Sequence, residues 1–192
     1  MIFISTGCLK GKNSRFTKDI FDVLETYAKL GIDNIELGAC HEHPRNLQKL
    51  FDYRMRRNAR FIIHTHFPAA NPPIMMNFAS QNDRLLKKTI AVAKNAVELS
   101  NMIDSEVYGI HGGFLTDFNT DLHALSEKTT REKAFKTLQH SIGEVCDSAS
   151  KYGIKIAVEN MHEGDSLLFN KIEDFRELFK RVSAKNLYVL LD

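Results

Sequence analysis

The sequence alternates short apolar runs with longer amphipathic segments, and the pattern repeats about every 30 residues, a spacing typical of βαβ units. The apolar runs predict buried strands near residues 2–6, 33–36, 61–64, 107–111, 154–159 and 187–191. Apolar residues at helical spacing predict helices near residues 17–31, 83–102, 130–152 and 171–183, with another that begins near Pro44 and ends before Asn58. Strands that alternate with helices lie parallel in one sheet. The sequence therefore predicts a single α/β domain over residues 1–192.

Most of the predicted strands end at a side chain that can bind a metal ion or move a proton. From the second strand onward, these terminal residues are Glu36, His64, His111, Glu159 and Asp192. A further histidine, His66, follows His64 by two positions. Because the carboxyl ends of parallel strands meet on one face, which is where α/β enzymes place their chemistry, these groups are expected to lie together. The pattern predicts a metal site or a general acid–base site.

The alternation of side chains along a strand predicts which way these groups point. Glu159 shares a face with Ala157, whereas Ile156 and Val158 lie on the opposite face. The bulky aliphatic residues are therefore expected to face the helices, and the polar group the interior of the sheet. Neighbouring strands are about 4.8 Å apart, so groups that end adjacent strands can reach a common centre.

Composition and charge exclude several classes of protein. The net charge of +2 is too small to require a nucleic-acid or membrane partner, and no apolar run approaches the roughly 18 residues of a membrane span. The N-terminus lacks the basic start and long apolar core of a signal peptide. Cys8, Cys40 and Cys146 are widely spaced without a CxxC motif, which indicates free thiols in a reducing compartment. A cytoplasmic protein is expected.

Four of the strand motifs resemble a known family. The segments FIIHTHFP, VYGIHGG, IKIAVENMHEG and LYVLLD are similar to strands three to six of the xylose isomerase-like TIM-barrel superfamily. That group contains sugar and sugar-phosphate isomerases and epimerases, with endonuclease IV as a branch. The resemblance implies a parallel (β/α) TIM barrel, of which this chain supplies about six strands and five helices. A complete barrel has eight strands in about 250 residues, so the last two βα units are expected to be missing at the C-terminus.

The resemblance also implies roles for the residues at the strand ends. Glu159 and Asp192 match metal-binding carboxylates, and His64 and His111 match histidines that ligate metal or line the substrate site. Glu159 and His111 are thereby implied as catalytic residues. The same resemblance places Glu36 against the substrate, and His64, His66 and His162 are the other candidate substrate-binding residues. His162 lies just beyond the fifth strand, where it would either approach the site or be exposed.

The implied function is that of a sugar or sugar-phosphate isomerase or epimerase dependent on Mn, Mg or Co. Such an enzyme abstracts a proton alpha to a carbonyl and proceeds through an enediolate. One alternative is a zinc phosphodiesterase acting on abasic DNA, as in the endonuclease IV branch, and another is a barrel remnant that binds a ligand or partner without catalysis. The absence of tryptophan and the small net charge argue against a nucleic-acid partner. The basic cluster of Arg54, Arg56, Arg57 and Arg60 is expected at a helix end away from the site.

The sequence also allows purely structural roles for some of these residues. Glu36 could cap a helix or form a salt bridge, and His111 could be a buried structural histidine. The segment at residues 40–43, CHEH, has metal-binding residue types but no second cluster to support it, so a solvated loop is expected there. An open six-stranded sheet would expose the edges of its first and last strands, which favours association and a possible homo-oligomer.

Overall fold

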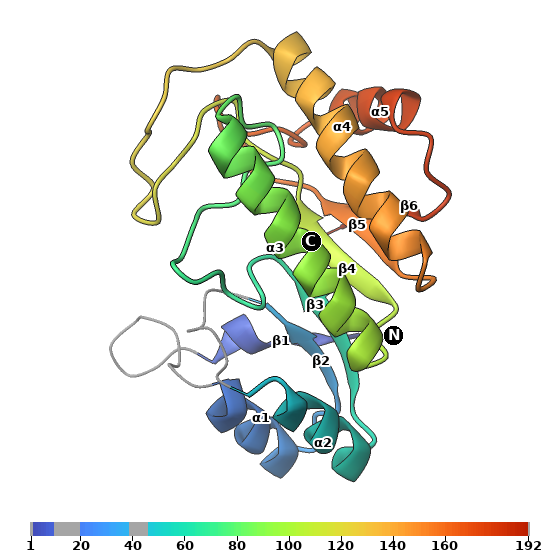
Figure 1. The fold of residues 1–192 in the computed structure, drawn as a ribbon. Coiled ribbons are helices and arrows are strands. Elements are labelled where there is room, and N and C mark those ends of the chain that lie inside the picture. Colours follow the sequence, from blue (N-terminus) through green and yellow to red (C-terminus); the bar gives the residue numbers. More distant parts are fainter. Residues whose placement is uncertain (1, 10–19, 39–45, 192) are drawn as a thin grey trace.

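The computed structural model describes residues 2–9, 20–38 and 46–191. Within these ranges the chain forms one six-stranded parallel sheet whose strands follow one another in sequence order (Figure 1). The strands are β1 (Ile4–Ser5), β2 (Asn34–Leu37), β3 (Arg60–His64), β4 (Val107–His111), β5 (Lys155–Glu159) and β6 (Leu187–Leu190). This confirms the predicted α/β class and the parallel arrangement of the strands.

The strands are joined by helices, as the periodicity predicts. A short 3₁₀ helix, η1 (Thr6–Cys8), follows β1, and the α-helices are α1 (Ile20–Lys29), α2 (Gln48–Arg57), α3 (Asp83–Met102), α4 (Arg131–Ser150) and α5 (Ile172–Arg181). A parallel sheet with strands in sequence order and right-handed crossovers places all its helices on one face. We call this helix-covered side of the sheet the outer face and the opposite side the inner face.

The register of the sheet decides which side chains share the inner face. Residues paired between adjacent strands point the same way, and the pairs Ser5–Glu36, His64–Gly109 and His111–Glu159 lie on the inner face. The outer face carries buried aliphatic and aromatic residues that pack against the helices, among them Ile35, Ile63, Tyr108, Ile110, Ile156 and Val158. The prediction for the fifth strand is confirmed, because Glu159 lies on the inner face and Ile156 and Val158 lie on the outer face.

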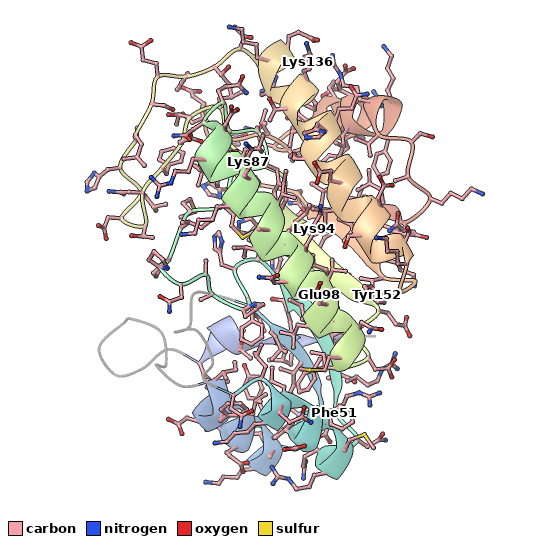
Figure 2. The ribbon with its side chains drawn as sticks, viewed as in Figure 1. Phe51, Lys87, Lys94, Glu98, Lys136 and Tyr152 are labelled. Carbon is pink, nitrogen blue, oxygen red and sulfur yellow. The ribbon has the colours of Figure 1, made fainter. Side chains whose placement is uncertain are left out.

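Helix α3 illustrates how the sequence produces these elements. The Asn82 side chain accepts hydrogen bonds from the backbone N–H groups of Arg84 and Leu85, which caps the first turn. Small residues of the helix are buried against its neighbours, whereas Lys87, Lys94 and Glu98 lie along its outward side (Figure 2). The predicted bounds of this helix, residues 83–102, are those of the structure.

Helix α2 begins later than the sequence predicts. Pro44 lies outside the described residues, and the helix starts at Gln48. The Asn46 Oδ1 atom accepts a hydrogen bond from the Gln48 N–H at 3.1 Å, so a polar residue that follows the proline fixes the helix start. The arginines in the last turn of α2 form ion pairs, Arg54 with Asp104, Arg56 with Glu25 and Arg57 with Asp33.

The last strand of the sheet is poorly covered. On β6, Tyr188 is 45% exposed and Val189 is 40% exposed, and Leu191 just beyond the strand is 85% exposed. Within the described residues, β6 pairs with β5 alone and β1 pairs with β2 alone. In the described sheet, β6 is thus an edge strand that carries exposed apolar side chains.

Candidate metal and substrate site

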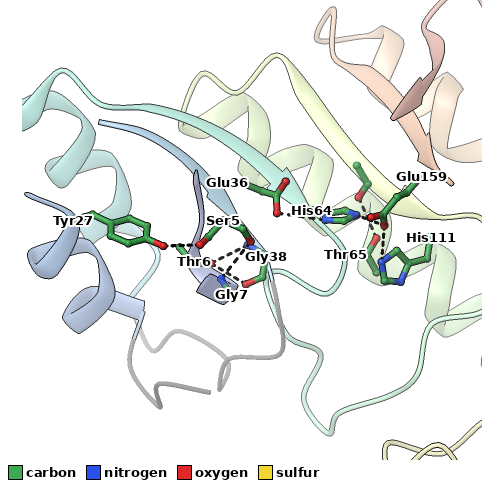
Figure 3. Close-up of polar contacts among 11 residues, drawn as sticks. Ser5, Thr6, Gly7, Tyr27, Glu36, Gly38, His64, Thr65, His111 and Glu159 are labelled. Atoms are coloured by element: carbon green, nitrogen blue, oxygen red, sulfur yellow. Dashed lines mark hydrogen bonds and ion pairs between the residues drawn. The ribbon is translucent and has the colours of Figure 1, made fainter. Parts of the chain in front are cut away.

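Three predicted site residues converge at the carboxyl ends of adjacent strands. His64 ends β3, His111 ends β4 and Glu159 ends β5. The Glu159 Oε2 atom lies 3.0 Å from His64 Nε2 and 2.8 Å from His111 Nε2 (Figure 3). One ligand atom from each residue lies within 4.8 Å of the other two. The structure thus brings together a cluster that the sequence predicted from separate strand ends.

His64 and Glu159 meet in a buried contact that lacks the alignment of a good hydrogen bond. His64 Nε2 and Glu159 Oε2 are both buried and lie 3.0 Å apart, and neither has a well-aligned hydrogen-bond partner. Buried polar atoms that are poorly satisfied are costly, and a cation bound beside both atoms would satisfy them. Two imidazole nitrogens and a carboxylate oxygen are donors that suit a transition-metal ion such as zinc, manganese or cobalt. These residues therefore fit a divalent metal.

Glu36 approaches the same cluster from β2. Its Oε1 atom lies 3.6 Å from His64 Nδ1, too long for a hydrogen bond but within range of an electrostatic contact (Figure 3). The Ser5 hydroxyl of β1 hydrogen-bonds the Glu36 carboxylate. Burial alone would raise the pKa of Glu36, but its contacts with His64 and Ser5 lower it overall. Glu36 is thus a charged group turned toward His64.

The electrostatics of the cluster favour opposite charges in the metal-free protein. Burial alone would raise the pKa of Glu159, but its contacts with His111 and His64 hold that pKa well below its usual range. Burial likewise disfavours a charged His64, yet the contacts with Glu159 and Glu36 raise its pKa to about 9. A cation is therefore favoured between these two carboxylates, whether it is a proton on His64 or a metal ion beside it.

His66 lies beside this cluster and has a different environment. Burial, with His111 and His64 nearby, lowers the pKa of His66 to about 4, so the ring is neutral at pH 7. Its Nδ1 atom is buried and has no hydrogen-bond partner, and its ring centroid lies 5.8 Å from that of His111. A neutral ring with an unpaired nitrogen can accept a hydrogen bond from a bound molecule or donate one to it.

Two glycines make room for the cluster. A Cβ atom added at Gly109 would lie 2.8 Å from His64 Cδ2, closer than such atoms approach in proteins. A Cβ atom added at Gly38 would lie 3.2 Å from Glu36 Oε1. The sequence interpretation did not single out these glycines or Ser5. A glycine inside a strand, as at Gly109, indicates a close approach by another group, and Ser5 ends its strand with a polar side chain as the others do.

The remaining predicted site residues are not part of the cluster as described. His162 lies in the loop after β5 and is exposed, and no described contact joins it to the histidines at the strand ends. Asp192 lies outside the described residues, as does the CHEH segment at residues 40–43. Their predicted roles stay predictions. Glu36, His64, His66, His111 and Glu159 are the candidates that the structure places near one another.

Comparison with known proteins assigns the fold family. Residues 24–192 match the family described as Xylose isomerase-like TIM barrel. The chain belongs to this family. The uncharacterized protein MJ1311 of Methanocaldococcus jannaschii is 30% identical to this xylose isomerase-like chain over 172 residues, which cover 88% of the chain and 54% of that protein. The resemblance that the strand motifs indicated is therefore confirmed.

Solved structures of sugar epimerases share the xylose isomerase-like fold. A D-tagatose 3-epimerase-like protein superposes with a TM-score of 0.75 at 24% identity, covering 98% of this chain and 63% of that protein. L-ribulose 3-epimerase gives a TM-score of 0.73 at 13% identity, covering 100% of this chain and 60% of that protein. At such identities the likeness establishes the barrel fold. The chain spans about half the length of its curated relative and less than two thirds of these structures. No helix in the described ranges is long and apolar enough to cross a membrane.

Proposed function

We propose that this chain carries the metal site of a sugar or sugar-phosphate isomerase or epimerase that depends on a divalent metal ion. The observation that carries the proposal is the cluster of His64, His111 and Glu159 at the carboxyl ends of three adjacent barrel strands. This is the face on which TIM barrels place their catalytic groups. The fold shared with proteins described as D-tagatose 3-epimerase-like and L-ribulose 3-epimerase supports the same reaction class.

The residues of the cluster suit this chemistry. His64, His111 and Glu159 would hold the ion, with Asp192 as a further ligand, and the ion would act as a Lewis acid toward the carbonyl oxygen of a sugar. Glu159 would also present a carboxylate beside the substrate, where a proton alpha to a carbonyl is to be removed. Loss of that proton yields the enediolate through which the substrate is isomerised or epimerised.

His111, besides holding the ion, and His66 are suited to orient the sugar. The His111 side chain is 25% exposed, the most accessible of the three cluster residues, so a substrate hydroxyl can reach its side of the site. The neutral His66 ring beside it offers a hydrogen-bonding nitrogen without adding positive charge. Hydroxyl groups of a sugar are neutral donors and acceptors, and such a surface matches them.

The donor set itself favours a second candidate. Two histidines and one carboxylate form a ligand set that is common for zinc, and a zinc ion held there would activate water for attack on a phosphodiester. The alternative is therefore a zinc phosphodiesterase that acts on abasic DNA. The arginines of α2 do not support it, because Arg54, Arg56 and Arg57 are neutralised by ion pairs in the structure.

Metal content and activity together test the proposal. We would measure bound metal by plasma mass spectrometry for the wild type, for Glu159→Ala, and for Glu98→Ala, an exposed glutamate of α3 that serves as a matched control. The proposal predicts close to one manganese, cobalt or magnesium ion per chain, lost in Glu159→Ala alone, together with interconversion of ketoses differing at C3.

Two other results would overturn the proposal. Bound zinc with cleavage of abasic DNA and no sugar turnover would establish the phosphodiesterase. A wild-type protein that binds no metal and converts no sugar would leave a barrel that lacks the proposed activity.

A further inference from the structure

We propose that Glu36 is a positioning residue that acts on the metal site through His64, by keeping a hydrogen on Nδ1 of that ring and leaving Nε2 free as a ligand atom. The inference rests on the proposed metal site, and it gives Glu36 a role different from the substrate contact that the family resemblance implies. A histidine that ligates metal through one nitrogen usually donates the N–H of the other to a carboxylate, a backbone carbonyl or water, which fixes the orientation of its ring.

The ring of His64 has a carboxylate facing each of its two nitrogens, as this arrangement requires. Nε2 faces Glu159 at 3.0 Å and Nδ1 faces Glu36 at 3.6 Å, so the ring lies between two carboxylates on opposite sides (Figure 3). The His64 side chain is 12% exposed, and Glu36 is the carboxylate that faces its Nδ1 atom. A modest shift of the Glu36 carboxylate would bring Nδ1–H within hydrogen-bonding distance.

Glu36 is itself held in place from β1. The Ser5 Oγ atom accepts a hydrogen bond from the Gly7 N–H at 3.3 Å, so the hydroxyl hydrogen of Ser5 remains free for the Glu36 carboxylate. Gly38 borders the same space, where an added Cβ atom would lie 3.2 Å from Glu36 Oε1 and 3.4 Å from His64 Cβ. The contacts therefore form a continuous line from Ser5 through Glu36 and His64 to Glu159.

Metal titration distinguishes a positioning role from a substrate contact. We would titrate metal-free protein with Zn²⁺ by calorimetry, comparing the wild type with Glu36→Ala and Glu36→Gln. The control is Glu25→Ala, which removes an exposed glutamate of α1 far from the site. Glu36→Ala should weaken binding by about 10- to 100-fold, the usual effect of removing a carboxylate behind a ligating histidine. Glu36→Gln should retain part of the affinity, because its amide oxygen still accepts a hydrogen bond. Unchanged affinity in Glu36→Ala would overturn the inference.

A second measurement does not depend on metal binding. In the metal-free wild type, the Nδ1–H signal of His64 should be visible by NMR, because a buried hydrogen held against a carboxylate exchanges slowly. We expect Glu36→Ala to lose this signal and Glu25→Ala to retain it. If the wild type binds no metal, the proposed function fails and this signal alone decides the inference. A signal that persists in Glu36→Ala would refute the role of Glu36.

A substitution next to Glu36 covers the case in which Glu36→Ala does not fold. Gly38→Ala leaves Glu36 in place but crowds its carboxylate, and it should also weaken metal binding and speed the exchange of the His64 hydrogen. Gly143→Ala, where an added Cβ atom meets nothing within 4 Å, is the matched control and should behave as the wild type. Equal behaviour of the two glycine variants would count against the inference.

Discussion

At the scale of single residues, the ring of His64 is placed between two carboxylates. It lies between Glu36 and Glu159, and these contacts, acting against burial, raise its pKa to about 9. The ring is therefore protonated at pH 7, whereas a histidine must be neutral to ligate a metal ion. The binding of metal and the loss of a proton from His64 are thus one coupled event.

This coupling predicts the direction of the pH dependence of metal binding. Raising the pH from 6.5 toward 9 removes the competing proton, so apparent affinity should rise, by up to about tenfold per pH unit, and then level off above the His64 pKa. Calorimetric titrations in buffers of different ionisation enthalpy should show about one proton released per metal at pH 7.5. An affinity that does not change over this range would contradict the assigned contacts.

Cys146 allows a separate prediction at the residue scale. The side chain is buried in α4, and burial together with Asp147 raises the pKa of its thiol to about 12. Because the thiolate is the reactive form, Cys146 should resist alkylation by iodoacetamide at pH 8 in the folded protein. The exposed Cys8 should be labelled, and peptide mass mapping before and after denaturation separates the two. Equal labelling of both thiols in the folded state would show that Cys146 is accessible.

At the scale of elements, the start of a helix could be predicted where the residue at that position caps the helix with its own side chain. Asn82 closes the first turn of α3, and this bond can be anticipated from the residue type alone. The start of α2 was not predictable from Pro44, because a proline tolerates a first turn without requiring one. In α2, the hydrogen bond from the Gln48 N–H to the Asn46 side chain sets the start of the helix. Both residues are polar, and no pattern in the sequence distinguishes them.

The cap of α3 gives a stability prediction. Asn82→Ala leaves the N–H groups of Arg84 and Leu85 without their acceptor and should reduce the free energy of unfolding by about 1 kcal/mol. Asn95→Ala, at an exposed position in the middle of the same helix, makes the same chemical change without removing a cap. It should be neutral or slightly stabilising, because alanine is the better helix former. Urea denaturation of the two variants measures the difference, and similar losses in both would argue against the cap.

On the scale of the whole sheet, the edge of β6 that faces away from β5 has no partner strand among the described residues. Unpaired backbone groups on an edge strand are a template for pairing with another chain, and β6 adds exposed apolar side chains to them. A polypeptide of residues 1–192 should therefore self-associate as its concentration rises. Val189→Lys should reduce this association, because a charged residue on an edge strand opposes pairing.

Sedimentation measurements over a range of concentrations test this expectation. Ile172→Lys places the same charge on an exposed apolar position of α5, away from the sheet edge, and is the matched control. If it reduces association as much as Val189→Lys, the contact does not run through β6.

Most of the site could be predicted because its candidate ligands lie at the carboxyl ends of parallel strands, which a sheet brings together on one edge. His64, His111 and Glu159 each end an apolar run, and parallel strands bring such ends together without any information about side-chain contacts. The line from Ser5 through Glu36 could not be predicted, because it depends on carboxylate positions and on space left by Gly38 and Gly109. The glycine inside β4 and the polar end of β1 indicate a close approach, but they do not say which groups meet, because that depends on three-dimensional distances.

The pairing of His111 with Glu159 and of His64 with Gly109 ties the site to the alignment of the strands. Side chains alternate between faces, so a slip of one residue in β3, β4 or β5 would turn a ligand out of the inner face and toward the helices. A barrel with near-native secondary structure but shifted strands would look intact by circular dichroism and would bind no metal. Metal binding would thus report whether each of these strands has found its correct partner during refolding.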